Sequence, residues 1–486
     1  MRYDFDIAII GGGAGGLFAA SVANGLGAKA CLIEKSRLGG DCTWFGCMPS
    51  KALLKSAQIA HLFKRYAEFG LDAQGGFSVD ASKVMSHVRD VVEEIATHHP
   101  AEVFEKRGIK VIFGSPKFID QKSLEINSQK ITAKKFIICT GSHPVIPLIE
   151  GFKEIDYLTN ENVFALEKPP ESIIVLGGGP IGVELAQALN RLGVKVYIVE
   201  MMQRLLFRED DEISSLLEKT VRREGIQVLT STKAIKFSKD NGKTCVTIEV
   251  QNKKPLSTYE VAKGKQDTIC ADKVLAAIGR APNTGGLDLE KAGVEYAKTG
   301  IKVNEFLQTT NKNIFACGDV VGPYMFSHVA SYQAQICVRN AFLRRIAWGK
   351  VNYQSIAWAT FTEPEVAHLG LTEEEAGAKY KNMRVYKTEY SSVDRAVTDL
   401  EKEGLIKVIT DKKGFILGAH IVGAQASEII QGFLLAKFFK IPLSKLSQAL
   451  FIYPTLSELV KKTAAKPLLE KANNPLVKFA LSMLKT

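Results

Sequence analysis

Two cysteines, Cys42 and Cys47, are the residues of this sequence whose chemistry is easiest to infer. They lie within residues 39–51, a segment that begins with a glycine pair and ends with Pro-Ser-Lys. Two thiols this close in the chain can interconvert between a dithiol and a disulfide, and so carry two electrons. A CxxxxC pair lacks the ligand set of a zinc site. We therefore expect a redox-active pair, and we predict no bound metal.

The local geometry of the pair requires a break in the helix. In an undistorted helix, side chains five positions apart point about 140° apart, so the two sulfurs would not meet. Gly46 gives the backbone the freedom for such a break. Pro49 suits a first helical turn, and we expect the helix to continue over residues 50–63. A helix N-terminus stabilises nearby thiolates and lowers their pKa.

Two glycine-rich turns, each between a predicted strand and a predicted helix, indicate where nucleotides bind. A second apolar strand follows each turn and ends in an acid, 23 residues after the first glycine in both motifs (34 − 11 and 200 − 177). The glycines let the backbone approach a pyrophosphate at a helix N-terminus, and the acid takes ribose hydroxyls. We predict two bound dinucleotides. The residues are Gly11, Gly13, Gly16 and Glu34 in the first motif, and Gly177, Gly179, Gly182 and Glu200 in the second.

The acid of the second motif bears on the choice of dinucleotide. Glu200 favours an unphosphorylated ribose and hence NADH, because a 2′-phosphate prefers cationic partners. Arg204 lies nearby, so NADPH stays open. The first motif is followed directly by the cysteine pair, so its cofactor is the one expected near the thiols.

The predicted strands indicate an α/β protein with two Rossmann-like domains, the first of them split. Apolar strands near residues 136–142, 274–284 and 313–319 support the split, and Asp319 is placed either to bind a ribityl chain or to cap a helix. Antiparallel strands at 405–410 and 415–422, joined by a turn at 411–414, and a helix over 427–439 predict a C-terminal α+β domain. The predicted domains are residues 1–150 and 271–348, 151–270, and 349–486.

These motifs, in this order, resemble the flavin-dependent pyridine nucleotide–disulfide oxidoreductases, which include dihydrolipoamide dehydrogenase, glutathione reductase and mercuric ion reductase. The resemblance covers residue 4 to about residue 465. It implies FAD at the first motif, NAD(P)H at the second, and a homodimer formed by the C-terminal domain. Further cofactor contacts are implied at Gly40, Asp41, Lys51, Thr140, Gly141, Gly279, Arg280 and Asp319.

The resemblance also implies roles for the reactive side chains. Cys47 resembles the flavin-facing sulfur, and Cys42 resembles the interchange thiol that meets the substrate. Lys51 corresponds to a residue that stabilises negative charge on the reduced flavin, and Glu184 to the residue that orients this lysine. Taken without the resemblance, Lys51 and Glu184 read as solvated surface charges.

One departure from the family bears on the substrate. Members that act on dithiols or disulfides carry a His-Pro…Glu motif near the C-terminus, whose histidine shuttles protons. Here Tyr453 takes the place of the histidine, and Glu458 is kept. Moving a proton onto tyrosinate rather than histidine at neutral pH costs about 4–5 kcal/mol more. The tyrosine resembles mercuric ion reductase, although the C-terminal cysteine pair of that enzyme is missing; an ordinary interface tyrosine is the other interpretation.

Two further departures lie in the redox segment. Asp41 replaces a common threonine of the family, and Trp44-Phe45 replaces a small or polar pair. These aromatics either shape a pocket above the disulfide or pack in the core.

Charge and composition exclude several classes of protein. The net charge is +11, of which +5 comes from residues 459–486. The sequence contains no basic helical segment interleaved with aromatic residues, so it does not predict nucleic-acid binding. No apolar run is long enough to span a membrane, and the N-terminus is unlike a signal peptide, so we expect a cytoplasmic protein. The basic, apolar tail either packs on the dimer or makes a weak contact with an anionic membrane surface.

The six remaining cysteines are scattered singly along the chain. We predict that all six are small buried hydrophobic residues. They are Cys31, Cys139, Cys245, Cys270, Cys317 and Cys337.

The function predicted from these features is electron transfer from NAD(P)H through FAD to the Cys42–Cys47 disulfide, and on to a small-molecule disulfide or a metal ion, as in cell redox homeostasis. A dihydrolipoamide dehydrogenase that oxidises a dithiol with NAD is the first alternative. A membrane-associated protein that keeps FAD only as structure is the second.

Overall fold

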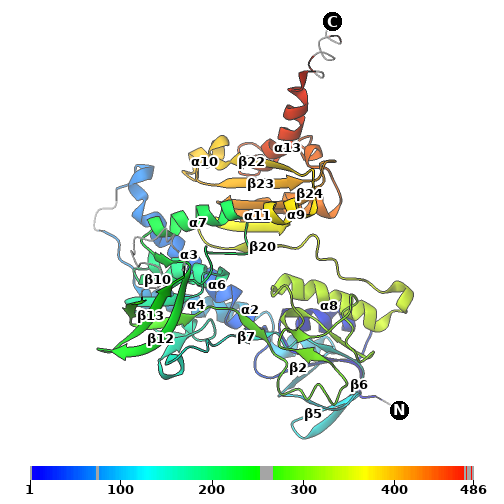
Figure 1. Cartoon of the computed structure of the whole chain (residues 1–486). Coiled ribbons are helices and arrows are strands. Elements are labelled where there is room, and N and C mark those ends of the chain that lie inside the picture. The colour runs from blue at the N-terminus through cyan, green and yellow to red at the C-terminus, as the bar shows by residue number, and fades with distance from the viewer. Residues whose placement is uncertain (1–2, 73–75, 252–265, 476–477, 479–482, 484–486) are drawn as a thin grey trace. The chain divides into compact units, whose positions relative to one another are not determined.

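The computed structural model describes residues 3–72, 76–251, 266–475, 478 and 483. Figure 1 shows the whole chain, whose internal contacts divide it into two compact units. The first comprises residues 1–176, 236–245 and 270–352, and the second comprises residues 177–235, 246–269 and 353–486. Over the described stretches, no helix combines the length and the apolar character that crossing a membrane requires. Within the predicted tail, residues 476–477, 479–482 and 484–486 lie outside the described residues.

The first unit is built on a seven-stranded sheet. Its order is β3-β2-β1-β6-β5-β4, with β19 also paired to β6. The pairs among β1, β2, β3, β6 and β19 are parallel, whereas β4, β5 and β6 pair antiparallel. The strands are β1 (Phe5–Ile10), β2 (Ala30–Glu34), β3 (Lys110–Phe113), β4 (Lys117–Asp120), β5 (Ser123–Ile126), β6 (Gln129–Ile138) and β19 (Ile314–Ala316).

The parallel part of this sheet contains the predicted first dinucleotide motif. β1 and β2 are apolar and almost wholly buried, as expected of parallel strands covered on both faces. Helices α1 (Ala14–Gly25) and α8 (Ser327–Phe342) share one hydrophobic core with β1 and β2 (Figure 1). The antiparallel extension through β4 and β5 has no counterpart among the predicted strands.

Close backbone approach explains the glycines of this motif. A side chain on Gly16 would place its Cβ 1.7 Å from the carbonyl oxygen of Gly11. Gly11 itself has a φ of +108°, a conformation that L side chains rarely adopt. Gly40 has a φ of +61°, and a Cβ there would lie 2.6 Å from the Cα of Gly13. The turn therefore packs at a distance that only glycine permits.

The first unit contains further helices and short strands. They are α2 (Gly40–Trp44), α3 (Cys47–Lys64), α4 (Ala81–Ala96), α5 (Ala101–Lys106), β7 (Ser142–Pro144), β8 (Tyr157–Leu158), β9 (Ser172–Leu176), β15 (Lys273–Ala276), β16 (Arg280–Pro282), β17 (Tyr296–Ala297) and β18 (Gly300–Ile301). β15 pairs in parallel with both β8 and β9, and β16 pairs antiparallel with β7. Strands β12 (Thr232–Asp240), β13 (Lys243–Val250) and β14 (Gln266–Ala271) carry the chain across the division between the units.

Two of the cysteines differ from the prediction. Cys245 of β13 and Cys270 of β14 form a disulfide, so the interpretation as small packed hydrophobes is wrong for this pair. Their Cα atoms lie 4.0 Å apart although 25 positions separate them in the chain. The pairing depends on how β13 and β14 are aligned, which the residues around each cysteine do not indicate. The other four single cysteines are buried thiols, as predicted.

In the second unit, the second glycine motif leads into helix α6 (Pro180–Arg191). Strands β10 (Lys195–Val199) and β11 (Gln227–Leu229) run parallel, and α7 (Asp211–Arg223) connects them. Gly177 has a φ of +103°, and Gly179 caps the N-terminus of α6. The geometry repeats that of the first motif.

An antiparallel sheet of order β20-β21-β24-β23-β22 forms the rest of the second unit. The predicted strands and turn at residues 405–422 are present, since Gly414 donates its N–H to the carbonyl of Asp411. Helices α11 and α13 share the core on one face. The elements are β20 (Ala357–Thr360), β21 (Glu365–Gly370), β22 (Arg384–Glu389), β23 (Leu405–Thr410), β24 (Ile416–Gly423), α9 (Glu373–Lys379), α10 (Asp394–Thr398), α11 (Ala426–Phe438), α12 (Leu443–Leu446) and α13 (Glu458–Ala472).

Candidate active site

The two candidate redox cysteines lie on either side of a helix break. Cys42 is in α2, and Cys47 is the first residue of α3. Gly46 between them has φ −121° and ψ −109°, outside the helical region. A Cβ on Gly46 would lie 3.0 Å from the carbonyl oxygen of Asp41, so this position has little room for a side chain. The structure thus contains the predicted interruption of the helix.

Hydrogen bonding shifts the pKa values of the two thiols in opposite directions. Both are free thiols here, which corresponds to the reduced form of the pair. The hydrogen bond from Cys47 lowers the pKa of Cys42 to about 6, burial opposes this, and a hydrogen bond with Ser327 adds to the lowering. The same hydrogen bond to Cys42, together with burial, raises the pKa of Cys47. At neutral pH the arrangement favours a thiolate on Cys42 and a proton on Cys47.

Ser327 is a neighbour of the pair that sequence reasoning missed. Its hydroxyl oxygen lies 3.9 Å from the sulfur of Cys47. Ser327 is the first residue of α8, so the N-terminal end of a 16-residue helix is beside the sulfurs. The only signal in the sequence is a serine before an apolar helical segment, and such serines are common at helix starts.

The first glycine motif is held in place by its own distal acid. Glu34 is 8% exposed, and its Oε2 accepts the N–H of Gly12 at 2.7 Å. Its Oε1 accepts the N–H of Ser36 at 2.8 Å. The predicted ribose ligand therefore also stabilises the turn that would hold the pyrophosphate.

Several predicted cofactor contacts meet in a second group of side chains. The Nε–H of Arg280 donates to the hydroxyl of Ser142 at 2.7 Å, and this hydroxyl donates to Asp319 at 2.6 Å. Arg280 also lies 3.2 Å from a carboxylate oxygen of Asp41. Burial raises the pKa of Asp319, although Ser142 and Arg280 act against this. The structure thus brings Asp41, Arg280 and Asp319 together.

Two further residues of this group were absent from the prediction. The hydroxyl of Thr140 donates to the carbonyl of Asn283 at 2.7 Å, and the amide of Asn283 donates to the carbonyl of Thr140 at 2.8 Å. The amide of Asn160 donates to the carbonyl of Phe45 at 3.1 Å and so reaches the redox segment. The adjacent predicted contacts Gly141 and Gly279 have φ values of +69° and +133°, which glycine supplies.

The second glycine motif shows the same use of its acid. Glu200 is 8% exposed, and its two oxygens accept the N–H groups of Gly178 and Met202, both at 2.6 Å. Glu184, in α6, is buried and accepts the N–H of Phe361 at 2.8 Å. Lys51 belongs to the first unit and Glu184 to the second, so their predicted pairing stays a prediction.

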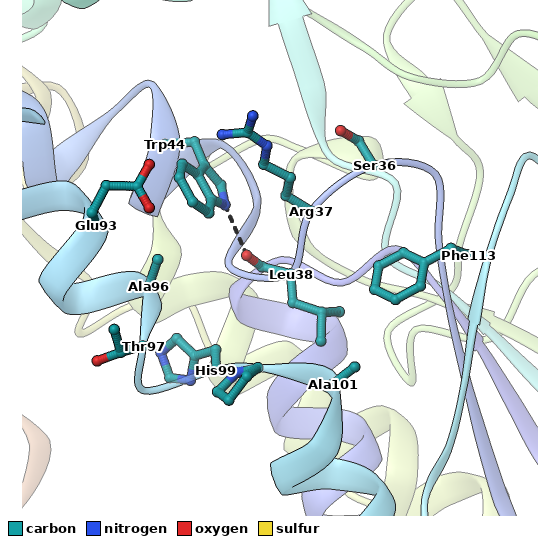
Figure 2. A pocket seen from close by; sticks show the side chains of 11 residues that line it. Ser36, Arg37, Leu38, Trp44, Glu93, Ala96, Thr97, His99, Ala101 and Phe113 are labelled. Carbon is teal, nitrogen blue, oxygen red and sulfur yellow. Dashed lines mark hydrogen bonds between the residues drawn. The ribbon is translucent and has the colours of Figure 1, made fainter.

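Trp44 of the redox segment lines a cavity of about 360 Å³ (Figure 2). Its indole N–H donates to the carbonyl of Leu38 at 2.8 Å, and the guanidinium of Arg37 lies over its ring. The cavity adjoins the loop that follows Glu34, and neither cysteine lines it. Phe45 does not line it either. Of the two aromatics, therefore, Trp44 shapes a cavity beside the first dinucleotide motif.

Tyr453 and Glu458 lie at the C-terminal end of the second unit. The hydroxyl of Tyr453 donates to Asp394 at 2.9 Å, and the side chain is exposed. This hydrogen bond and the negative charge of Asp394 raise the pKa of Tyr453. Glu458 is the first residue of α13.

The described residues fit the predicted FAD site. The turn around Gly11 and Gly16 leaves no room for side chains, and its backbone leads into the N-terminus of α1, as a pyrophosphate requires. Asp319 is available to a ribityl chain. When FAD is bound, it supplies hydride and electron chemistry between a nicotinamide and the sulfurs.

We expect Cys42 to be the more reactive thiol of the reduced enzyme. Because its pKa is lowered to about 6, its thiolate predominates above that pH, and only the thiolate is nucleophilic. Iodoacetamide should modify Cys42 before Cys47, with a rate that is half-maximal near pH 6 and flat above about pH 7. Peptide mass spectrometry of samples quenched at each pH measures this. A rate still rising between pH 8 and 9, or modification of Cys47 first, would contradict the assignment.

Comparison with known proteins assigns the chain to a family. The model of the pyridine nucleotide-disulphide oxidoreductases matches residues 5–334, and that of the family's dimerisation domain matches residues 356–464. A mercuric reductase of Staphylococcus aureus is 34% identical over 463 residues, which cover 95% of this chain and 82% of that protein. A dihydrolipoyl dehydrogenase of Thermus scotoductus is 34% identical over 462 residues, which cover 95% of this chain and 96% of that protein.

A solved structure agrees with these matches. The Cu(II) complex of the HOCl-induced flavoprotein disulfide reductase RclA from Escherichia coli has a TM-score of 0.82 at 26% identity, over 96% of this chain and 99% of that one. The predicted fold class, two Rossmann-like domains for FAD and NAD followed by a dimerisation domain, is confirmed. The protein belongs to the pyridine nucleotide-disulphide oxidoreductase family and is an FAD-dependent enzyme.

Proposed function

We propose that this enzyme passes electrons from NADH, through FAD, to the Cys42–Cys47 disulfide and then to a metal ion held by the resulting thiolates. The disulfide takes up two electrons and one proton and becomes a thiolate and a thiol. The thiol loses its proton to solvent, and the two electrons pass to the thiolate-bound metal, either to one two-electron acceptor such as Hg²⁺ or to two one-electron acceptors such as Cu²⁺, while the sulfurs return to the disulfide. The environment of Tyr453 is the observation that carries this choice of acceptor.

Tyr453 is poorly suited to proton transfer at neutral pH. A dithiol substrate must give up protons to a nearby base before its sulfurs can attack a disulfide. The hydrogen bond to Asp394 raises the pKa of Tyr453 further above that of a histidine, so tyrosinate is scarce at pH 7. A metal ion bound by thiolates needs no such base. We propose that Tyr453 and Glu458 face the substrate from the second subunit of a homodimer.

The relatives support the same class of acceptor. One is a mercuric reductase, and the RclA structure is a Cu(II) complex. The first name gives a mercury ion as the ion acted on, and the second title gives copper as the ion bound. The dihydrolipoyl dehydrogenases among the relatives keep a second function open, in which the enzyme oxidises a dithiol with NAD.

We propose NADH as the electron donor. Glu200 places a buried carboxylate at the end of β10, where a 2′-phosphate would meet like charge. Arg204 is not well placed to offset this charge, because its guanidinium is 2.5 Å from Asp211 and also donates to the carbonyl of Phe207 at 3.1 Å. These contacts support the unphosphorylated cofactor.

We propose the following roles for the other residues. Cys47 receives electrons next to FAD, and Cys42 presents its thiolate to the metal ion. The hydrogen bond from Ser327 helps to lower the pKa of Cys42 and so favours its thiolate. Lys51, oriented by Glu184, stabilises negative charge near the flavin. Asp41, Arg280 and Asp319 form one hydrogen-bonded group, which fixes the wall of the FAD site. A cytoplasmic location remains our expectation.

The acceptor can be tested with anaerobic enzyme and NADH. We expect Hg²⁺ or Cu²⁺ to be reduced at a higher kcat/KM than lipoamide. Replacing Tyr453 with His should raise the oxidation of dihydrolipoamide by NAD at least about tenfold, because a positioned general base contributes about 10²–10⁴-fold. Absorbance of NADH measures both reactions.

Tyr453→Phe is the matched control, because it removes the hydroxyl and keeps the ring. Under the proposal, this variant oxidises dihydrolipoamide no more slowly than the wild type. If the wild type instead prefers lipoamide to both metals, and Tyr453→Phe abolishes that activity, the enzyme is a dihydrolipoamide dehydrogenase and the proposal is wrong.

The choice of nucleotide can be tested at Glu200. Glu200→Gln removes the charge and keeps the shape, so the kcat/KM ratio of NADPH to NADH should rise about tenfold, which corresponds to about 1.4 kcal/mol. The equivalent change in the first motif, Glu34→Gln, should leave that ratio unchanged. A wild-type preference for NADPH, or an unaltered ratio in Glu200→Gln, would show that Glu200 does not select the cofactor.

A further inference from the structure

The antiparallel sheet of the second unit carries a row of polar and aromatic side chains across its strands. Trp358 pairs in register with His368, His368 with His420, and His420 with Lys407. The residues on either side along β24, Ala419 and Ile421, belong to the aliphatic core under α11 and α13. Because side chains alternate along a strand, this row lies on the opposite face of the sheet.

The loop before α7 brings an acid to this row. Glu209 is 3% exposed, His368 is 2% exposed and His420 is fully buried. One ligand atom from each of the three residues lies within 4.8 Å of the corresponding atoms of the other two. Lys407 forms an ion pair with Asp210, the acid next to Glu209 in the chain, at 2.8 Å. Among the described residues, Glu209 has no lysine or arginine as an ion-pair partner, and one of its carboxylate oxygens lies 2.9 Å from the Nδ1 of His368.

The outer atoms of all three side chains are already oriented by hydrogen bonds. The Nε2 of His368 lies 2.8 Å from the carbonyl of Gly370, and the Nε2 of His420 lies 2.9 Å from the carbonyl of Leu371. The second carboxylate oxygen of Glu209 accepts the indole N–H of Trp358 at 2.6 Å. Histidines that ligate metals usually donate their other ring N–H in this way, and such partners fix the ligand's orientation.

One atom of this cluster is left without a partner. The Nδ1 of His420 is buried and has no hydrogen-bond partner among the described residues. With Nε2 donating to a carbonyl, this nitrogen carries a lone pair, and an unsatisfied buried acceptor of this kind is costly. His368, in turn, faces acceptors at both ring nitrogens. A cation at the centre would use the lone pair of His420 and replace a proton on His368.

We propose that Glu209, His368 and His420 bind a divalent transition-metal ion of the zinc class. Two imidazoles and one carboxylate are a known zinc ligand set, with a fourth position open to water. Tetrahedral ligands at about 2.0–2.2 Å from the metal lie about 3.3–3.6 Å apart, so the three side chains need only small shifts. The ion would tie β21 and β24 to the loop before α7. The three residues belong to the second unit and the cysteine pair belongs to the first, and the proposal differs from our expectation of no metal, which considered only the cysteines.

The test is calorimetric titration of Zn²⁺ into the untagged, FAD-loaded protein in a Cys42→Ser/Cys47→Ser background. That background removes the thiolates that would also bind zinc. We expect one Zn²⁺ per chain and a higher melting temperature with zinc. His420→Gln keeps a donor for Leu371 but loses the Nδ1 lone pair, so it should weaken binding at least tenfold. Glu209→Gln should do the same, and Trp358→Phe should weaken binding by about 10–100-fold.

His87→Gln, at an exposed histidine of α4, is the control and should bind zinc as the parent does. Flavin absorbance and near-ultraviolet circular dichroism of each variant report folding. Co²⁺ in place of zinc should give visible d–d bands without a thiolate charge-transfer band. Absence of bound zinc both in the titration and in elemental analysis after zinc dialysis would overturn the proposal. Unchanged affinity in well-folded His420→Gln and Glu209→Gln would overturn it as well.

Discussion

The close approach between the first dinucleotide turn and the start of the redox segment is the constraint on which the active site depends. The N–H of Gly39 donates to the carbonyl of Gly12 at 2.9 Å, and Gly40 packs against the Cα of Gly13 with no room for a side chain. These contacts fix where α2 begins. Because Cys42 and Cys47 follow within one helical turn and a short break, this backbone packing fixes where the thiols lie relative to the first dinucleotide motif.

A glycine turn held by backbone contacts is also present in the second unit. Glu34 and Glu200 each use both carboxylate oxygens to hold backbone N–H groups around a glycine turn. A buried acceptor that satisfies two donors keeps the turn in one conformation, which lowers the entropic cost of binding a dinucleotide. The acids therefore stabilise the turns themselves, in addition to their predicted contact with the ribose.

Much of this fold could be predicted because its signals are local. The strands around Gly11 and Gly177, the break at Gly46 and the turn at Gly414 all follow from short patterns of glycine and apolar residues. Contacts set by strand register were out of reach: the Cys245–Cys270 disulfide and the pairing of His368 with His420 join residues with no shared local pattern. Ser327 was missed for the same reason, since it reaches Cys47 from 280 positions away.

The central claim is that the cysteine pair stores two electrons in addition to those held by FAD. Anaerobic titration with dithionite, followed by flavin absorbance, measures the electrons taken up per chain. The account predicts that the wild type takes up two electrons more than Cys42→Ser, with a long-wavelength thiolate–flavin band at the intermediate stage. Equal uptake by both proteins, with no such band in the wild type, would contradict it.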